Sequence, residues 1–289
     1  MLQTLLLAVS SNNQQVVENK FSDLKLLYTN GFSAYSHMEI IGSRVYVLFR
    51  ESAGHDFYDG RLHMLYSDDN GENWVNQGEF YNPEDTIWTD FPSYHTVDPT
   101  YQADARDSIC LITPDGQYLL VICPVAIGKK TTIRETYTHN SVALKIPIIN
   151  GNQLDYVNKE ITYVDSAVNL FVSSTLFIKD GNLFTCGYSA ARNRFYKSTN
   201  GGSSWTFISN FAATTAMGGD NNYACSEVSL NLMSNGDIVG IGRNVFDYNV
   251  PSIFIKTTDE GQTWTYDYTS AFGGLDAPDV KPLLDGYFV

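Results

Sequence analysis

The sequence predicts an all-β protein, a β-propeller made of four-stranded antiparallel blades. Two recurring patterns predict this fold. Pairs of short apolar runs around a glycine-containing turn recur along the chain, and the pattern S/T-x-D/N-x-G-x-x-W follows three of these pairs. Each unit is therefore expected to contain strand A, a turn, strand B, a loop, strand C, a turn and strand D. Four antiparallel strands repeated in this order are the blades of a propeller.

The paired apolar runs predict the two inner strands, A and B, of each blade. A tight turn of the Asp-Gly or Asn-Gly type between two apolar runs is the strongest short-range signal for a β-hairpin. Five such hairpins are expected. They span 40–50, 110–123, 176–188, 230–243 and 281–289, with turns at Gly42, Gly116, Gly181, Gly236 and Gly286.

The second pattern predicts the turn between strands C and D. Its copies are YSDDNGENW at 66–74, KSTNGGSSW at 197–205 and KTTDEGQTW at 256–264. The Asp or Asn accepts hydrogen bonds from the turn backbone, the Ser or Thr adds a hydroxyl, and the Gly supplies positive φ. We expect each Trp to pack between blades. The second unit lacks the pattern, and there Asn150 and Gly151 are expected to form the turn.

The two ends of the chain predict how the ring closes. The last hairpin, 281–289, is followed by no strands C and D, whereas residues 1–30 contain two strand-like runs, LQTLLLAVS and LKLLYT. These runs would supply the outer strands of the last blade, so that residues 1–289 form a single domain. We therefore expect five blades, with six as the alternative.

Composition and charge exclude several classes of partner. The chain has 289 residues and a formal net charge of −14. Nucleic acids and anionic membranes need a basic surface, so neither is an expected partner. The N-terminal apolar run is too short for membrane insertion and lacks the flanks of a signal peptide. The extracellular or virion-associated location that we expect therefore requires prior removal of a signal or another route of export.

No metal or cofactor is expected. The five His lack the paired spacing of zinc ligands, and the acidic stretch 82–107 lacks the spacing of a calcium loop. The four Cys are too far apart for a CxxC pair, and we expect them to be buried free thiols.

Strand direction predicts where functional side chains gather. The A–B and C–D turns share one end of the blades, so the longer B–C and D–A loops share the other end. Residues that begin a strand A, such as Asp107 and Glu227, or end a strand B, such as Arg50 and Arg243, then lie near the axis at the loop end. Two further charged residues and a loop histidine would line the same axial pocket. The candidate ligand-binding residues are Arg50, Arg243, Arg106, Asp104, Asp107 and His55.

The repeated C–D turn resembles the Asp-box of sialidases and related BNR-repeat proteins, and the resemblance covers residues 32–289. In that family a Glu opens a strand A and an Arg closes the following strand B, a pattern that Glu227 and Arg243 match. The resemblance implies that this Glu assists a tyrosine nucleophile and that this Arg binds the substrate carboxylate through its planar fork.

The resemblance also implies a general acid and a nucleophile. The stretch FRESAGHDFYDGRLHMLYSDDNG (49–71) is similar to the first blade of the superfamily, where an Asp in the B–C loop is the general acid. Asp56 is the first candidate here, and Asp59 is the second. Tyr248, in the loop that follows Arg243, is the candidate nucleophile, although it does not stand at the family's position.

Two alternative functions follow, and both take a carbohydrate ligand, expected to be part of a glycoconjugate. The first is a sialidase-like glycoside hydrolase, a retaining exo-glycosidase acting on sialic acid or a similar acidic sugar. The second is a non-catalytic carbohydrate-binding propeller, such as an adhesin or a phage receptor-binding component. The Glu227 and Arg243 pair favours the first. His37, which stands where the family has an arginine at the head of its first strand A, favours the second.

Overall fold

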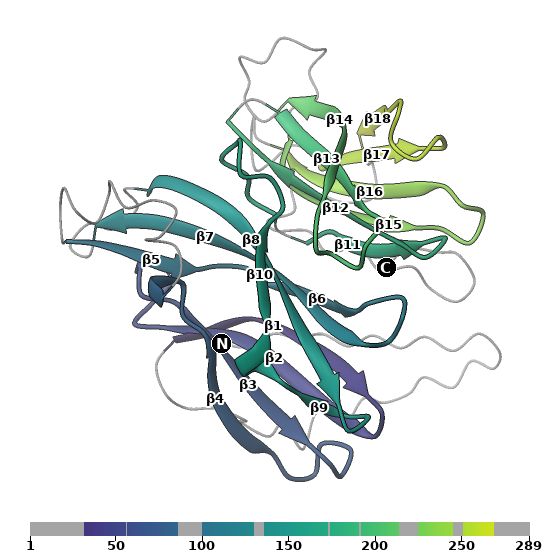
Figure 1. Cartoon of the computed structure of the whole chain (residues 1–289). Coiled ribbons are helices and arrows are strands. Elements are labelled where there is room, and N and C mark those ends of the chain that lie inside the picture. The colour runs from purple at the N-terminus through teal and green to yellow at the C-terminus, as the bar shows by residue number, and fades with distance from the viewer. Residues whose placement is uncertain are drawn as a thin grey trace, which may run out of the picture.

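The computed structural model confirms an all-β fold with a propeller arrangement of four small antiparallel sheets (Figure 1). Each sheet is one blade. The fifth blade expected from residues 1–30 and 281–289 lies outside the described residues, which support four blades and not five. The structure describes residues 32–55, 57–85, 100–129, 136–172, 174–190, 192–213, 225–244 and 251–268.

Three blades have the predicted order of four strands, with each strand paired to the next. The first blade contains β1 (Phe32–Ile41), β2 (Arg44–Ser52), β3 (Arg61–Ser67) and β4 (Val75–Tyr81), and the short helix η2 (Pro83–Asp85) follows it. The third contains β11 (Leu176–Lys179), β12 (Asn182–Tyr188), β13 (Arg192–Ser198) and β14 (Thr206–Ala213). The fourth contains β15 (Cys225–Leu232), β16 (Ile238–Asn244), β17 (Ile253–Thr257) and β18 (Thr265–Tyr268).

The second blade is built on the same plan, with its strand A split in two. Both parts of strand A pair with the long strand B, and the expected C–D turn is confirmed, with φ values of 53° at Asn150 and 80° at Gly151. Its elements are β5 (Tyr101–Ala105), β6 (Ile109–Ile112), β7 (Tyr118–Lys129), β8 (Thr136–Ile149), β9 (Gln153–Leu154), η3 (Tyr156–Asn158) and β10 (Glu160–Tyr163).

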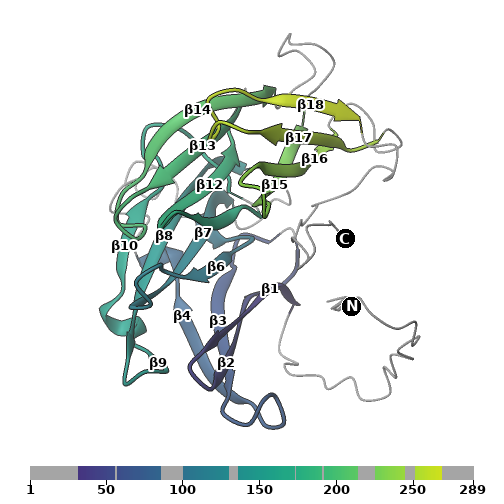
Figure 2. The ribbon, with the colours of Figure 1, turned by 90° about the vertical axis from the view of Figure 1, so that its right-hand side faces the viewer.

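The core consists of apolar clusters between neighbouring blades. One cluster joins the first and second blades, another the second and third, and another the third and fourth. Strand β7 shows why: Leu119 and Val121 face the first blade, whereas Leu120 and Ile122 face the third. A strand buried on both faces needs a continuous apolar run, and each such side chain contributes about 1.5–3 kcal/mol on burial. Figure 2 shows the blades stacked in this way.

The S/T-x-D/N-x-G-x-x-W segments form the predicted C–D turns. In the first copy, the Ser67 hydroxyl donates to Asp69 Oδ1 and accepts from the Gly71 backbone N–H, each at 2.8 Å. Asp69 Oδ1 also accepts from the backbone N–H of Asn73 at 2.8 Å. The backbone donors of the turn are therefore satisfied by side chains that the pattern itself specifies.

The other two copies repeat this chemistry. The hydroxyl of Ser198 accepts from the Gly202 N–H at 2.9 Å, and that of Thr257 accepts from the Gly261 N–H at 3.0 Å. Gly71, Gly202 and Gly261 have φ values of 90°, 90° and 86°, which confirms the predicted need for glycine at this position.

Trp264 shows how a C–D turn joins two blades. Its ring stacks on Phe211 of the preceding blade at 4.5 Å between centroids and meets Phe195 edge-on at 5.2 Å. Its indole N–H donates to Gly261 O at 3.0 Å. The prediction that this Trp packs between blades is confirmed, and its polar edge is satisfied within its own turn.

The A–B and C–D turns lie at one end of the blades, as predicted. The A–B turn of the first blade meets the C–D turn of the second, where a Cβ added to Gly42 would lie 3.1 Å from Gly151 O. Likewise, Lys179 of the third blade's A–B hairpin pairs with Glu260 of the fourth blade's C–D turn at 2.9 Å. We call this the turn end, and the opposite end the loop end.

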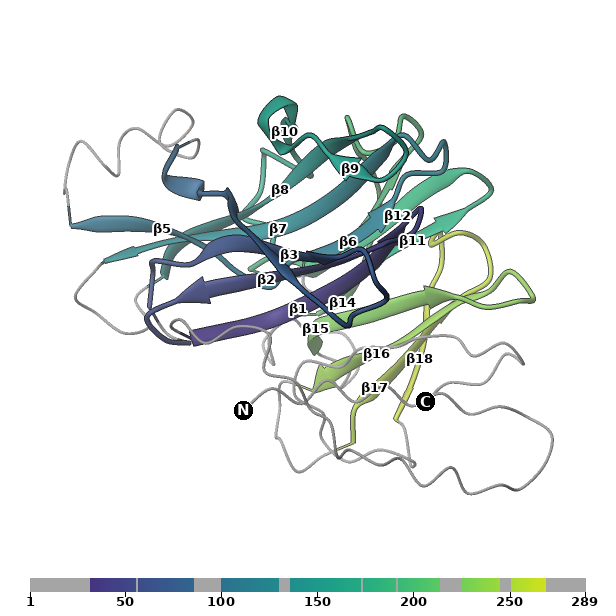
Figure 3. The same cartoon turned by 90° about the horizontal axis from the view of Figure 1, so that it is seen from below.

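The innermost strands lie side by side in the middle of the molecule, where β1 contacts β6, β6 contacts β11, and β11 contacts β15 (Figure 3). Several are irregular close to the loop end. The register of β1 shifts between Ala34 and His37, β5 and β6 are separated by residues 106–108, and the register of β15 shifts between Ser226 and Val228. Such bulges re-aim the side chains of the residues that they contain.

Candidate functional site

A cluster of charged side chains lies where the innermost strands are irregular. Asp107 lies in the break between β5 and β6, and Glu227 is the extra residue of the β15 bulge. The two occupy equivalent places in their blades, as their spacing from the turn glycines predicts. We call the residues gathered here the loop-end cluster: Arg50, Asp104, Arg106, Asp107, Tyr188, Glu227 and Arg243.

Arg50 and Asp104 form the buried base of the loop-end cluster. Arg50 lies close to the loop end of β2, and its side chain is 0% exposed. Its Nη2 lies 2.9 Å from Asp104 Oδ1, and its other donors reach the carbonyl oxygens of Gly54, Phe57 and Ala105. Arg50 thus fixes the B–C loop of the first blade against the second blade.

Gly60 is required by this arrangement. Its backbone N–H donates to Asp104 Oδ1 at 2.8 Å, and a Cβ at this position would overlap both Asp104 Oδ1 and Arg50 Nε. Burial raises the pKa of Asp104, while the guanidinium groups of Arg50 and Arg106 oppose that rise. The two guanidinium groups and the backbone N–H thus favour the charged form of a carboxyl group that burial disfavours.

Arg106 connects the buried base to the loop of the first blade. Its Nε lies 2.5 Å from Asp104 Oδ2, and its Nη1 donates to His55 O at 3.2 Å. The guanidinium also lies 5.4 Å from the ring centroid of Tyr58. Unlike Arg50, the Arg106 side chain keeps some exposure to solvent. It is therefore the member of this group that a ligand can reach.

Glu227 and Arg243 form an ion pair within the fourth blade. The distance from Arg243 Nη1 to Glu227 Oε2 is 2.8 Å, and both side chains are about one-fifth exposed, at 21% and 19%. Glu227 has a φ of 37°, in the left-handed region that a residue with a side chain adopts only at a cost of about 1–2 kcal/mol. The bulge thus holds this carboxylate in a strained backbone conformation.

Asp107 has an unusual environment for a carboxyl group. It is partly buried, and no described residue donates a hydrogen bond to it. Burial and the nearby charge of Glu227 raise the pKa of Asp107 to about 6, against the opposing effects of Arg106, Arg50 and His55. An unsatisfied carboxyl group in such a place is costly unless a proton or a ligand compensates it.

Tyr188 belongs to the loop-end cluster although the sequence analysis did not name it. It ends β12, and its ring stacks on Phe171 with 5.1 Å between centroids. Burial, followed by the charges of Glu227 and Asp107, raises the pKa of the Tyr188 hydroxyl. The signal that could have found it is the rule that residues ending a strand B lie at the loop end, the rule that selected Arg50 and Arg243.

The predicted site residues have different outcomes. Glu227, Arg243, Arg106 and Asp107 come together with accessible surface. Arg50 and Asp104 lie beneath them with no exposed side-chain surface, so the expectation that these two line a pocket is corrected: their charges satisfy each other inside the protein.

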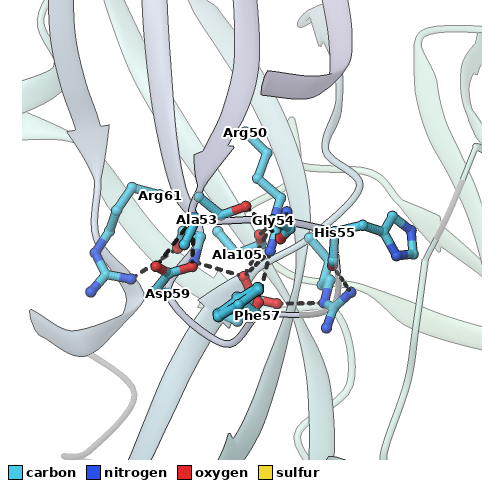
Figure 4. Close-up of polar contacts among 12 residues, drawn as sticks. Arg50, Ala53, Gly54, His55, Phe57, Asp59, Arg61 and Ala105 are labelled. Carbon is cyan, nitrogen blue, oxygen red and sulfur yellow. Dashed lines mark hydrogen bonds and ion pairs between the residues drawn. The ribbon is translucent and has the colours of Figure 1, made fainter. Parts of the chain in front are cut away.

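His55 is exposed, and the second acid candidate, Asp59, accepts from the Ala53 N–H at 3.2 Å (Figure 4). Asp56 and Tyr248 lie outside the described residues.

The cysteines have the state that the sequence predicts. The four cysteines are buried free thiols. Within the described ranges, no group of three or more His, Cys, Asp or Glu side chains is arranged to hold a metal ion. No helix in the described part of the chain is long and apolar enough to cross a membrane.

Solved structures of other proteins resemble this chain in fold, although comparisons of its sequence find no match. No family model matches the sequence, and no curated protein matches it. A protein of unknown function from Dyadobacter fermentans has a TM-score of 0.58 at 14% identity, over 88% of this chain and 72% of that chain. A mutant of NanB sialidase from Streptococcus pneumoniae has a TM-score of 0.59 at 12% identity, over 91% of this chain and 57% of that chain.

Trypanosoma rangeli sialidase, solved in complex with sialic acid, is a further neighbour. Its TM-score is 0.53 at 12% identity, over 81% of this chain and 37% of that chain. This chain thus matches only part of the length of these sialidases. At such identities the likeness concerns the fold alone, which is that of a sialidase-like β-propeller.

Proposed function

We propose that this chain binds a glycan at the loop end of its blades and hydrolyses a glycosidic bond there. One observation carries the proposal: Glu227, ion-paired with Arg243, is held in a strained bulge near Asp107, whose carboxyl group accepts no hydrogen bond from the described part of the chain. Backbone strain persists where the surrounding fold enforces it, and it concentrates at functional sites. Most glycoside hydrolases use a pair of carboxyl groups that lie in different environments.

The charges of the loop-end cluster favour an acidic sugar. When Asp107 carries a proton, the three arginines of the cluster face two carboxylates, Asp104 and Glu227, which leaves one net positive charge. A sugar carboxylate is attracted by that excess, and the planar fork of an arginine suits it. Sialic acid has such a carboxylate, and the fold likeness to sialidases supports this substrate class. The acid and nucleophile roles that the resemblance implies for Asp56 and Tyr248 stay predictions.

A second candidate function is non-catalytic carbohydrate binding. It is favoured by the fact that Arg106 and Arg243, the two arginines of the loop-end cluster with exposed surface, are each already paired with a protein carboxylate. In that state they present hydrogen-bond donors to sugar hydroxyls more readily than a free cation to a substrate carboxylate. A glycan-binding adhesin or receptor-binding protein needs no more than this.

Turnover of a panel of fluorogenic glycosides, with and without a carboxylate on the sugar, tests the proposal. We expect Glu227→Gln to lose turnover, and Arg243→Lys to lose most on acidic sugars because its bidentate fork is gone. Asp237→Asn is the matched control, since Asp237 pairs with Lys256 at 2.7 Å in the same blade but at the turn end. No turnover by the unaltered protein, together with selective binding on a glycan array, would establish the second candidate instead.

A further inference from the structure

We propose that Asp107 is the group that gives its proton to the glycosidic oxygen when the bond breaks. The inference rests on the proposed function and deepens it, because it assigns the acid to the second blade and not to the B–C loop of the first. It starts from the position of Asp107 in the gap between β5 and β6.

The backbone around Asp107 departs from regular pairing on the inner strand of the second blade. Ala105 pairs with Val125 and Ile109 with Ile122, so three residues on the inner strand stand opposite two on β7. The extra length forms a bulge in the strand that lies next to β1 and β11. Glu227, the bulged residue of β15, has the same place in its own blade. The charge of Glu227 acts on Asp107, so the two carboxyl groups lie near each other although they come from different blades.

The two carboxyl groups differ in their partners. Glu227 accepts a 2.8 Å hydrogen bond from the guanidinium of Arg243. Asp104, three residues before Asp107, accepts from Arg50 and Gly60 and pairs with Arg106. In contrast, none of the described residues donates to the Asp107 carboxyl, which is partly buried and yet keeps a path to solvent. Of the three acids, Asp107 is the one suited to hold and release a proton.

The charges that face Asp107 support this role. Burial and Glu227 raise the pKa of Asp107 to about 6, whereas Arg106, Arg50 and His55 lower it. Tyr188 and Cys123 also lie within its electrostatic reach, and burial raises the pKa of each, so both stay neutral near pH 7. A ligand carboxylate bound nearby would raise the pKa of Asp107 further. A proton donor works best when its pKa lies close to the working pH.

The proposed step is an acid-assisted hydrolysis. The Asp107 carboxylic acid transfers its proton to the glycosidic oxygen while the bond from that oxygen to the anomeric carbon breaks and its electron pair stays on the oxygen. The leaving sugar departs as an alcohol, and the ionised Glu227 stabilises the positive charge on the remaining ring. Water then adds its oxygen to the anomeric carbon, and the proton that it loses restores the Asp107 acid. The net change is hydrolysis, with one water consumed.

The test compares leaving groups, because a good leaving group needs no proton. We expect Asp107→Asn to slow cleavage of a substrate with an alkyl alcohol leaving group by about 100-fold or more, but that of a nitrophenyl glycoside by less than about 10-fold. The alkaline fall in kcat/KM, expected above about pH 6 in the unaltered protein, should disappear in this variant. Asp107→Glu should retain part of the activity. Asp237→Asn serves as the control for nonspecific loss.

Each outcome decides between distinct conclusions. An equal loss on both leaving groups with an unchanged pH profile means that Asp107 only binds or positions substrate, which overturns the inference and leaves the proposed hydrolysis intact. The inference is likewise overturned, and hydrolysis retained, if Asp56→Asn and not Asp107→Asn slows the alkyl substrate much more than the nitrophenyl substrate. If the unaltered protein binds glycans but cleaves none, both the inference and the hydrolytic function are rejected. A thermal melt of each variant shows whether a loss reflects unfolding.

Discussion

Arg243 and Glu227 meet across a bulge that breaks the pairing of their two strands, with 2.8 Å between Arg243 Nη1 and Glu227 Oε2. Arg243 pairs in the sheet with Ser226, so Glu227 has no partner in the ladder and is free to take a φ of 37°. The ion pair therefore depends on a backbone conformation that is energetically unfavourable for Glu.

The first prediction concerns this strain. Glu227→Gly should be more stable than Glu227→Ala by about 1–2 kcal/mol, because glycine adopts positive φ without the clash that a Cβ causes. Urea unfolding of the two variants measures the difference directly. Both should lose the effect of a glycan ligand on thermal melting. Equal stability of the two variants would show that the bulge relaxes once the carboxylate is removed.

The sequence predicted the parts of the fold that local chemistry determines. The pattern S/T-x-D/N-x-G-x-x-W contains its own hydrogen-bond donors and acceptors, so Ser67, Asp69 and Gly71 make the turn wherever it lies in the chain. The hairpins are equally local, because a turn glycine between two apolar runs fixes both strands. Counting residues from these turns also placed Asp107 and Glu227 at equivalent positions.

The rest of the site depends on contacts between distant segments. Arg50 looked like a ligand-binding residue because it ends a strand B, yet it is buried by Asp104, 54 residues further along the chain. The residues around Arg50 in the sequence do not show that the B–C loop and β5 cover its side chain. The strained φ of Glu227 is equally invisible in the sequence, since it follows from a register shift between β15 and β16.

The second prediction concerns the buried pair. Arg50→Ala should cost about 3–5 kcal/mol of unfolding free energy, because it leaves the Asp104 carboxylate buried with one partner fewer. Replacing both residues together, as Arg50→Met with Asp104→Leu, should cost less than the single change. Asp68→Asn, at the exposed pair with Arg44, is the control and should shift the urea midpoint little. A double variant as unstable as Arg50→Ala would contradict this account.

The third prediction concerns the C–D turns. Thr257 is 2% exposed, and its hydroxyl donates to Asp259 and accepts from the Gly261 N–H. Thr257→Val keeps the shape but leaves that N–H unsatisfied, so it should cost about 1–3 kcal/mol. Thr257→Ser should cost less, since Ser67 and Ser198 serve in the other copies. The comparison of Val with Ser in urea unfolding isolates the hydroxyl, and equal losses would assign the effect to packing.

The fourth prediction concerns pH. The pKa of Asp107 is raised from its ordinary value of 3.8 to about 6, so the folded protein keeps a proton that the unfolded chain has already lost between about pH 4 and pH 6. In that window the unfolded state binds fewer protons, so the stability contributed by this group falls as pH rises and stays low above about pH 6. Two pKa units correspond to roughly 3 kcal/mol, which partial exposure reduces to about 2 kcal/mol.

Asp107→Asn removes this dependence, because its side chain is neutral at every pH. Relative to the unaltered protein, the variant should therefore gain about 2 kcal/mol of unfolding free energy between about pH 3 and about pH 7, measured by urea denaturation. Asp69 and Asp259 have pKa values of about 2, lowered by hydrogen bonds within their turns, and so titrate below this window. A variant whose stability curve runs parallel to that of the unaltered protein would show that Asp107 ionises normally. In that case Asp107 would be a permanent carboxylate at the loop end and could not donate a proton near pH 6.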